Sequence, residues 1–334
     1  MNSSHDAITL EGAKNLMDSI MTNHRMLYVI CPHNIGDFLI NGGFCHALQK
    51  RKRKQSCILI ACDKFRNINI NFVGVSDIIY ISKQGMSLIQ QYIFATALYE
   101  TDLYVYGHFH DSGHIPKGPD IPSSFVDLYR QNVFCLPREE RLLPPIVDDI
   151  EESRKQELHS LYHINKDTVI LMPHAYSVEK PPSANLWMQL CRDLLERGYH
   201  VYTNVAGSEV AVEGTLPLRV DLPELFYLAD KARCFIALRS GINDFLAFTK
   251  ARILCILEPM HWYFDLKRNY PACNSKSYYY IGGYRKEIES FMQQNNVTDF
   301  RQLNFAAEHV NDASLYLEDI HLIHAILQDV DAEL

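Results

Sequence analysis

Short apolar runs alternate with helical segments along most of the chain, and this pattern restricts the possible folds most strongly. The runs lie at residues 26–31, 56–63, 76–82, 102–109, 167–175, 199–205, 233–241 and 252–258. Runs of this length that are apolar on both faces are typical of parallel strands with helices on both sides of the sheet. The sequence therefore predicts an α/β protein built from β-α-β units.

The segments between these runs carry apolar residues at helical spacing. We expect helices at residues 9–24, 38–52, 85–99, 148–164, 182–198, 222–232, 242–250, 284–294 and 312–329. Residues 278–283 are expected to form an edge strand. Gly42 and Gly43 should let the helix that contains them pack closely, because glycine has no side chain.

Residues 111–147 interrupt the alternation with six prolines and two glycines, so we expect a loop that contacts the substrate. The chain has 334 residues, whereas a single domain has roughly 100–200. The sequence predicts two domains, residues 1–147 and 148–334, with the alternative that the C-terminal helices pack back on the first. Ligands of parallel sheets bind beyond the carboxyl ends of the strands, so the cleft between the domains is the expected site.

The net charge is −8, from 40 acidic and 32 basic residues. This balance argues against a protein that coats nucleic acid, which needs an excess of positive charge. The nine cysteines form no CxxC pair and lie mostly in apolar runs, which favours a reducing cytoplasm. We expect a soluble cytoplasmic protein, because neither a signal peptide nor a membrane-spanning run is present.

The basic run 51–54 ends an expected helix. Cations are favourable at that position because of the helix dipole, so a solvated helix end is the main interpretation. A peripheral contact with the anionic inner face of the membrane is the alternative.

Asp37 follows the first strand and begins a helix, at the carboxyl edge of the predicted sheet. A carboxylate there could act as a general base toward an acceptor hydroxyl. The alternative is an acidic residue that only caps the helix. Asn34, in the turn before Asp37, is a candidate for acceptor binding.

Two polar turns follow strands in the second half. Residues 173–180 contain His174, Ser177 and Lys180, and a hydroxyl with an ammonium group suits a phosphate. Residues 203–209 contain Asn204 and a glycine, which lets a ligand approach the backbone. A solvated polar turn and an ordinary strand-to-turn junction are the respective alternatives.

The sharpest signal is the segment 239–244, which reads RSGIND after an apolar run. Backbone N–H groups of Ser240 and Gly241, the helix dipole and the Arg239 guanidinium would converge on a diphosphate. Asn243 and Asp244 complete this set of donor-binding candidates. The alternative is that Arg239 pairs with Asp244 as a structural link. The segment is not a Walker loop, since GxxxxGK[ST] is absent.

His108 and His110 lie at the end of the fourth run. Neither cysteines nor paired carboxylates lie at metal spacing from them. We therefore expect acceptor binding from one of these histidines and no metal site.

In their order along the chain, these motifs resemble those of bacterial glycosyltransferases of the GT-B type. The resemblance is nearest to the heptosyltransferase-like family nine. The resemblance covers roughly residues 26–260. It rests on Gly36-Asp37, the turn PHAYSVEK, the loop TNVAGSE, the Leu-Pro-Glu-Leu segment at 222–225, and RSGIND. It implies two Rossmann-like domains that face each other across a cleft, with the acceptor in the first and a nucleotide-sugar donor in the second. It also implies inverting transfer without metal or cofactor, with Asp37 as base.

The segment 239–244 departs from the family, in which an acid stands at the position of Arg239 and a histidine at that of Asp244. The donor identity therefore does not carry over. The expected function is transfer of a sugar to a glycan or glycolipid acceptor in bacterial surface polysaccharide synthesis. Two alternatives stay open: a nucleotide-sugar epimerase of the same fold, using His174 and Glu209, and a non-catalytic protein that binds sugar nucleotides.

Overall fold

A computed structural model describes residues 3–32, 34–108, 124–175, 178, 180–258, 264–280, 316–317 and 319–332. The chain divides into two compact units, Met1–Asp149 and Ile150–Leu334. Each unit has its own parallel sheet, which confirms the predicted α/β class. No helix in the described parts of the chain combines the length and the apolarity needed to cross a membrane.

The sheet of unit 1 has four parallel strands in the order β4-β2-β1-β5. Their bounds are Met26–Cys31 (β1), Ser56–Cys62 (β2), Val75–Ile81 (β4) and Tyr104–Tyr106 (β5). A small antiparallel pair joins β3 (Ile70–Phe72) to β6 (Pro145–Val147). The last strand of unit 1, β6, thus pairs with β3 from the middle of the unit.

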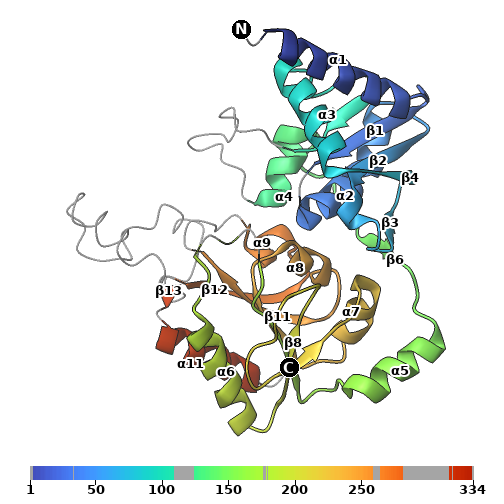
Figure 1. Ribbon diagram of the computed structural model, residues 1–334. Coiled ribbons are helices and arrows are strands. Elements are labelled where there is room, and N and C mark those ends of the chain that lie inside the picture. Colours follow the sequence, from blue (N-terminus) through green and yellow to red (C-terminus); the bar gives the residue numbers. More distant parts are fainter. Residues whose placement is uncertain are drawn as a thin grey trace, which may run out of the picture. The chain divides into compact units, whose positions relative to one another are not determined.

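Helices cover both faces of this sheet. On one face α1 (Ser3–Ile20) and α3 (Lys83–Thr96) lie side by side and bury Met17, Ile89 and Ile93 against β1 and β2 (Figure 1). On the other face lies α2 (Ile35–Arg51). A Cβ atom on Gly42 would lie 2.3 Å from the ring of Phe72, which confirms the close packing predicted there.

Three short elements complete unit 1. They are the 3-10 turn η1 (Asp63–Phe65), the helix α4 (Phe125–Leu128) and the π-helical turn η2 (Tyr129–Val133). The last two lie inside the segment that the sequence predicted to be a loop, so that prediction was wrong for residues 125–133.

Among the residues that the structure describes, the sheet of unit 2 has seven parallel strands in the order β13-β12-β11-β10-β7-β8-β9. Their bounds are Thr168–Met172 (β7), His200–Asn204 (β8), Leu216–Leu218 (β9), Cys234–Leu238 (β10), Arg252–Leu257 (β11), Asn274–Tyr280 (β12) and Tyr316–Leu317 (β13). The prediction of an edge strand at 278–283 was wrong, because β12 pairs with β11 on one side and with β13 on the other.

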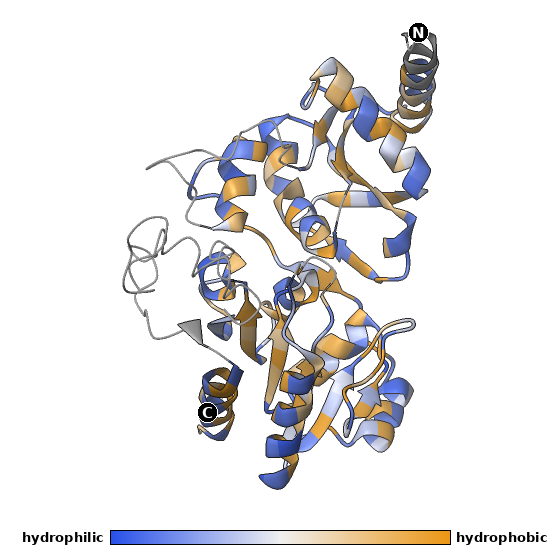
Figure 2. Ribbon diagram, turned by 60° about the vertical axis from the view of Figure 1, so that its left-hand side comes forward, coloured by the Kyte–Doolittle hydropathy of each residue, from blue (hydrophilic) through white to orange (hydrophobic). Residues whose placement is uncertain are grey.

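The helices of unit 2 are α5 (Glu152–Tyr162), α6 (Ala184–Glu196), α7 (Leu222–Ala229), α8 (Gly241–Leu246), α9 (Leu266–Asn269) and α11 (Asp319–Asp331). One face of the sheet carries α6 and α11, whose Trp187, Leu190 and Ile326 share one core with β7, β10 and β11. Figure 2 shows apolar residues running along the central strands of both sheets. The helix expected at 284–294 lies outside the described residues.

The end of α11 is fixed to unit 2 by arginines. Arg233 donates to the backbone oxygens of Val330 (2.5 Å) and Asp331 (3.2 Å), and Arg252 donates to that of Ala332 (3.3 Å). These cations satisfy carbonyl groups that have no partner within the helix and complement its dipole. The C-terminal helix is therefore part of the core of unit 2.

Candidate functional site

The first group of candidate residues lies where the strand order of unit 1 reverses. The chain passes from β1 outward through β2 to β4 and then returns to place β5 on the other side of β1. Ligands of open parallel sheets bind at such a point, beyond the carboxyl ends of the two strands. Asp37 follows β1 and His108 follows β5, so both lie at this edge.

Asp37 is held by hydrogen bonds to both of its carboxylate oxygens. The backbone N–H of Asn34 donates to Oδ2 (2.9 Å), and the hydroxyl of Tyr129 donates to Oδ1 (2.5 Å). The side chain stands in the first turn of α2 and is 6% exposed. Its negative charge is also favoured by the N-terminal end of the helix dipole.

Tyr129 is fully buried and comes from η2. Its ring packs against Phe125 (5.1 Å between centroids) and Phe134 (5.8 Å). Burial raises the pKa of Tyr129 well above its usual value, and the charge of Asp37 raises it further. The phenol is therefore a hydrogen-bond donor at ordinary pH. No local sequence pattern marks Tyr129, because it stands in a proline-rich segment far from Asp37 in the chain.

A second contact braces the first turn of α2. The side-chain amide of Asn41 donates to the backbone oxygens of Asp37 (2.7 Å) and Gly107 (2.8 Å). Gly107 directly follows β5, and its N–H extends the sheet by donating to Ile30 (2.8 Å). The backbone that carries Asp37 is thus tied to the end of β5.

The three acceptor-binding candidates have different outcomes. The ring of His108 lies edge-on to Tyr129, with 6.3 Å between centroids, so the structure brings it to the Asp37 group. Asn34 is exposed and contributes its backbone N–H to Asp37. His110 lies outside the described residues. Acceptor binding by these residues stays a prediction.

The second group lies at the corresponding point of unit 2. The chain runs from β7 through β8 to β9, then returns to place β10 beside β7. The segment 239–240 follows β10, and the turn with His174 and Lys180 follows β7. Two stretches of sequence that were singled out separately therefore share one edge of the sheet.

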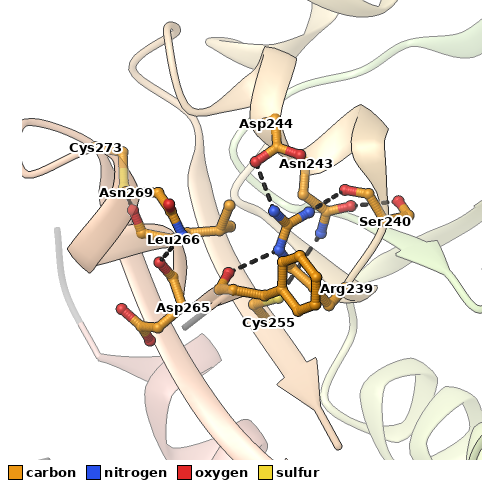
Figure 3. Close-up of polar contacts among 10 residues, drawn as sticks. Arg239, Ser240, Asn243, Asp244, Cys255, Asp265, Leu266, Asn269 and Cys273 are labelled. Atoms are coloured by element: carbon orange, nitrogen blue, oxygen red, sulfur yellow. Dashed lines mark hydrogen bonds and ion pairs between the residues drawn. The ribbon is translucent and has the colours of Figure 1, made fainter. Parts of the chain in front are cut away.

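Arg239 is almost enclosed, with 9% of the residue exposed, and its donors are directed at protein groups (Figure 3). It forms an ion pair with Asp244 (2.6 Å) and donates to the backbone oxygens of Phe264 (2.7 Å) and Ser240 (2.5 Å). Burial opposes its charge, but the attraction of Asp244, together with contributions from Cys255 and Tyr270, outweighs burial, and the pKa of Arg239 is raised. The alternative that the sequence left open, a structural link to Asp244, is what the structure shows.

The rest of the segment forms the start of α8. Ser240 is the N-cap residue, and its hydroxyl donates to the side-chain oxygen of Asn243 (2.6 Å). Asn243 and Asp244 are buried, while Ser240 and Gly241 are half-buried. The first N–H groups of a helix have no partner within the helix, so this turn can offer backbone donors to an anion.

Lys180 lies near the same turn. Its backbone N–H donates to the carboxylate of Glu258 (3.3 Å), which directly follows β11. Because β10 lies between β7 and β11, this bond places residue 180 across the carboxyl end of β10. Glu258 is buried and was not singled out from the sequence, although an acid after an apolar run was the available signal.

The remaining donor-binding candidates lie around β8. The ring nitrogen Nε2 of His174 lies 2.9 Å from the backbone oxygen of Val210, in the loop after β8. Asn204 is the half-buried last residue of β8. The carboxylate of Glu209 accepts from the N–H of Ala206 (2.8 Å) and so closes its own turn. Ser177 lies outside the described residues.

No group of three histidine, cysteine or acidic side chains that could hold a metal ion occurs among the residues that the structure describes. The basic run after α2 is partly neutralised, because Arg51 (2.6 Å) and Lys52 (2.5 Å) both pair with Glu100.

Comparisons with known proteins place this fold. No family model and no curated protein matches the sequence. The family 9 glycosyltransferase from Veillonella parvula has a similar structure, with a TM-score of 0.56, 12% identity, and coverage of 92% of this chain and 98% of that chain. The ADP-heptose lipopolysaccharide heptosyltransferase II of E. coli has a TM-score of 0.51 and 13% identity, and the match covers 75% of this chain and 89% of that chain. The chain thus has the heptosyltransferase-like GT-B fold with two Rossmann-like domains, as its motif order predicted.

Proposed function

We propose that this protein is a glycosyltransferase that moves a sugar from a nucleotide-sugar donor to a hydroxyl of a glycan or glycolipid acceptor. The observation that carries the proposal is Asp37, a buried carboxylate oriented through both oxygens at the carboxyl edge of the unit 1 sheet. The fold supports it, because similar structures are glycosyltransferases, one of them named for ADP-heptose and lipopolysaccharide. We place the reaction in bacterial surface polysaccharide synthesis, in the cytoplasm.

In the proposed reaction, Asp37 accepts the proton of the acceptor hydroxyl as its oxygen attacks the anomeric carbon of the donor sugar. The bond from that carbon to the nucleoside diphosphate breaks, and attack from the opposite side inverts the anomeric centre. General-base assistance of this kind contributes roughly 10²–10⁴-fold. His108 and Asn34 are proposed to contact the acceptor.

The leaving diphosphate is proposed to lie at the carboxyl edge of the unit 2 sheet. The side chain of Lys180 and the backbone N–H groups of Ser240 and Gly241 would neutralise it, so that no metal is needed. Arg239 is proposed to contribute by holding this turn in place, since three of its donors are engaged with Asp244 and two backbone oxygens. Asn204, His174 and Ser177 are proposed to contact the rest of the donor.

A nucleotide-sugar epimerase would need free acid and base groups near the donor. Glu209 accepts a hydrogen bond from its own loop, and the ring of His174 contacts the backbone of that loop. Both side chains are thus engaged in fixing the loop, which favours transfer over epimerisation.

The proposal is tested by a screen of UDP, GDP, ADP and CMP sugars for thermal stabilisation, because a ligand that binds only the folded state raises the unfolding temperature. The stabilising donor is then incubated with and without a truncated glycolipid acceptor. A transferase releases the nucleotide of its donor, a nucleoside diphosphate for UDP, GDP and ADP sugars, and extends the acceptor only when donor and acceptor are both present. Conversion of the donor to an isomer without acceptor would indicate an epimerase. Stabilisation without any turnover would favour the non-catalytic alternative.

A further inference from the structure

We propose that Tyr129 is the positioning residue of the proposed base: its hydroxyl fixes the orientation of the Asp37 carboxylate toward the acceptor. This inference rests on the proposed function. It concerns a residue from a segment with no recognised motif, brought to Asp37 by a turn that the sequence did not predict.

Two hydrogen bonds determine the orientation of the Asp37 carboxylate. Tyr129 donates to Oδ1 of Asp37 and the Asn34 N–H donates to Oδ2, so each oxygen is held by a donor. Donors on both oxygens fix the rotation of the carboxylate plane, whereas a cap on one oxygen alone would leave it free to turn.

The position of the Tyr129 hydroxyl is itself determined by packing. The ring is enclosed by Phe125 and Phe134, and its backbone begins a π-helical turn in which the N–H of Phe134 donates to the Tyr129 carbonyl (2.9 Å). Such turns insert one extra residue into a helical run and are frequent at functional sites. The turn places the ring of Phe134 against the ring of Tyr129.

The hydrogen bond also affects the proton affinity of the base. A donor to the charged form of a carboxylate stabilises that form, so Tyr129 makes Asp37 a weaker base that is ionised at lower pH. Around this pair, the described residues place the titratable groups Tyr106 of β5, Cys31 of β1 and His108. We therefore expect the phenol to lower the basicity of Asp37 while it fixes the orientation of that carboxylate.

The test compares Tyr129→Phe, which removes only the hydroxyl, with Tyr104→Phe. Tyr104 is a matched control because it is also a buried tyrosine of unit 1, and its hydroxyl donates to the backbone oxygen of Leu98 (2.9 Å). The titration of the Asp37 carboxyl is followed by ¹³C NMR, with the signal assigned from Asp37→Asn. The rate of transfer is measured against pH in parallel.

For Tyr129→Phe we expect Asp37 to titrate at higher pH, and the acid limb of the pH–rate profile to move up with it. We expect kcat to fall by about 10- to 100-fold, the cost of a misoriented reacting group, with the KM for the donor unchanged. Tyr104→Phe should change none of these. An unchanged or lower titration midpoint in Tyr129→Phe, or an equal effect of both variants, would overturn the inference.

A second substitution keeps the test decisive if Tyr129→Phe folds poorly. Site-specific 3-fluorotyrosine at position 129 retains the ring and is a stronger donor, so it should move the Asp37 titration to lower pH. No movement would contradict the inference. The titration needs no turnover: a shift without transfer in the wild-type protein would reject the proposed function while retaining the Tyr129–Asp37 link.

Discussion

At the scale of single residues, the ion pair of Arg239 and Asp244 defines the role of the segment 239–244. Here the two side chains contact each other at 2.6 Å, with the base first and the acid second. The pair therefore joins the end of β10 to the start of α8.

The structural role of this pair predicts a specific pattern of stability. Arg239→Met leaves the charge of Asp244 buried without its cation, so we expect a loss of about 3–5 kcal/mol in the free energy of unfolding. The double variant Arg239→Met/Asp244→Leu should recover most of that loss, because no uncompensated charge remains. Chemical denaturation measures both.

Calorimetry with the nucleoside diphosphate of the stabilising donor completes this test. If Arg239 acts through the turn, the double variant should bind within roughly threefold of the wild type, a difference of less than 1 kcal/mol. A double variant that is well folded but binds more than about tenfold more weakly would show that the guanidinium itself contacts the diphosphate.

At the scale of elements, the end of β5 controls the start of α2. Asn41 joins the backbone of Asp37 to that of Gly107 through two hydrogen bonds. A Cβ atom at position 107 would lie 1.5 Å from Oδ1 of Asn41. Glycine is therefore required at this position by close approach, and the placement of the proposed base depends on it.

We accordingly predict that Gly107→Ala destabilises the protein by about 1–3 kcal/mol, the usual cost of forcing atoms into a packed site. It should also reduce transfer, because the first turn of α2 must shift. Gly12→Ala is the matched control: a Cβ atom there has no neighbour within 4 Å, and helix propensity should stabilise α1 by about 0.5–1 kcal/mol. Thermal unfolding compares the two, and equal effects would contradict the account.

At the scale of the whole molecule, the two units use the same arrangement twice. In each, the candidate residues follow two strands that flank the reversal of strand order, β1 and β5 in unit 1 and β7 and β10 in unit 2. Asp37 belongs to the first and the turn at Ser240 to the second. In the proposed function, the acceptor binds at the first of these edges and the donor at the second.

The sequence predicted this architecture because buried parallel strands need runs that are apolar on both faces, and the eight runs all contain strands. It missed β3, β6, β9 and β13, which have only two or three residues and no such run. It placed Asp37 at the start of a helix but could not find Tyr129, since contact across 92 residues leaves no local pattern. It also left the partner of Arg239 undecided, because the charge of a side chain does not show which group that side chain faces.

The most direct test of the central claim is the rate at which Asp37→Asn transfers sugar from the stabilising donor to a truncated glycolipid acceptor. Asp77→Asn serves as the control, because it makes the same change at an exposed position of β4. If Asp37 is the base, Asp37→Asn lowers kcat by roughly 10²–10⁴-fold while donor affinity, measured by calorimetry, is unchanged, and Asp77→Asn matches the wild type. Transfer by Asp37→Asn at the wild-type rate would contradict this role.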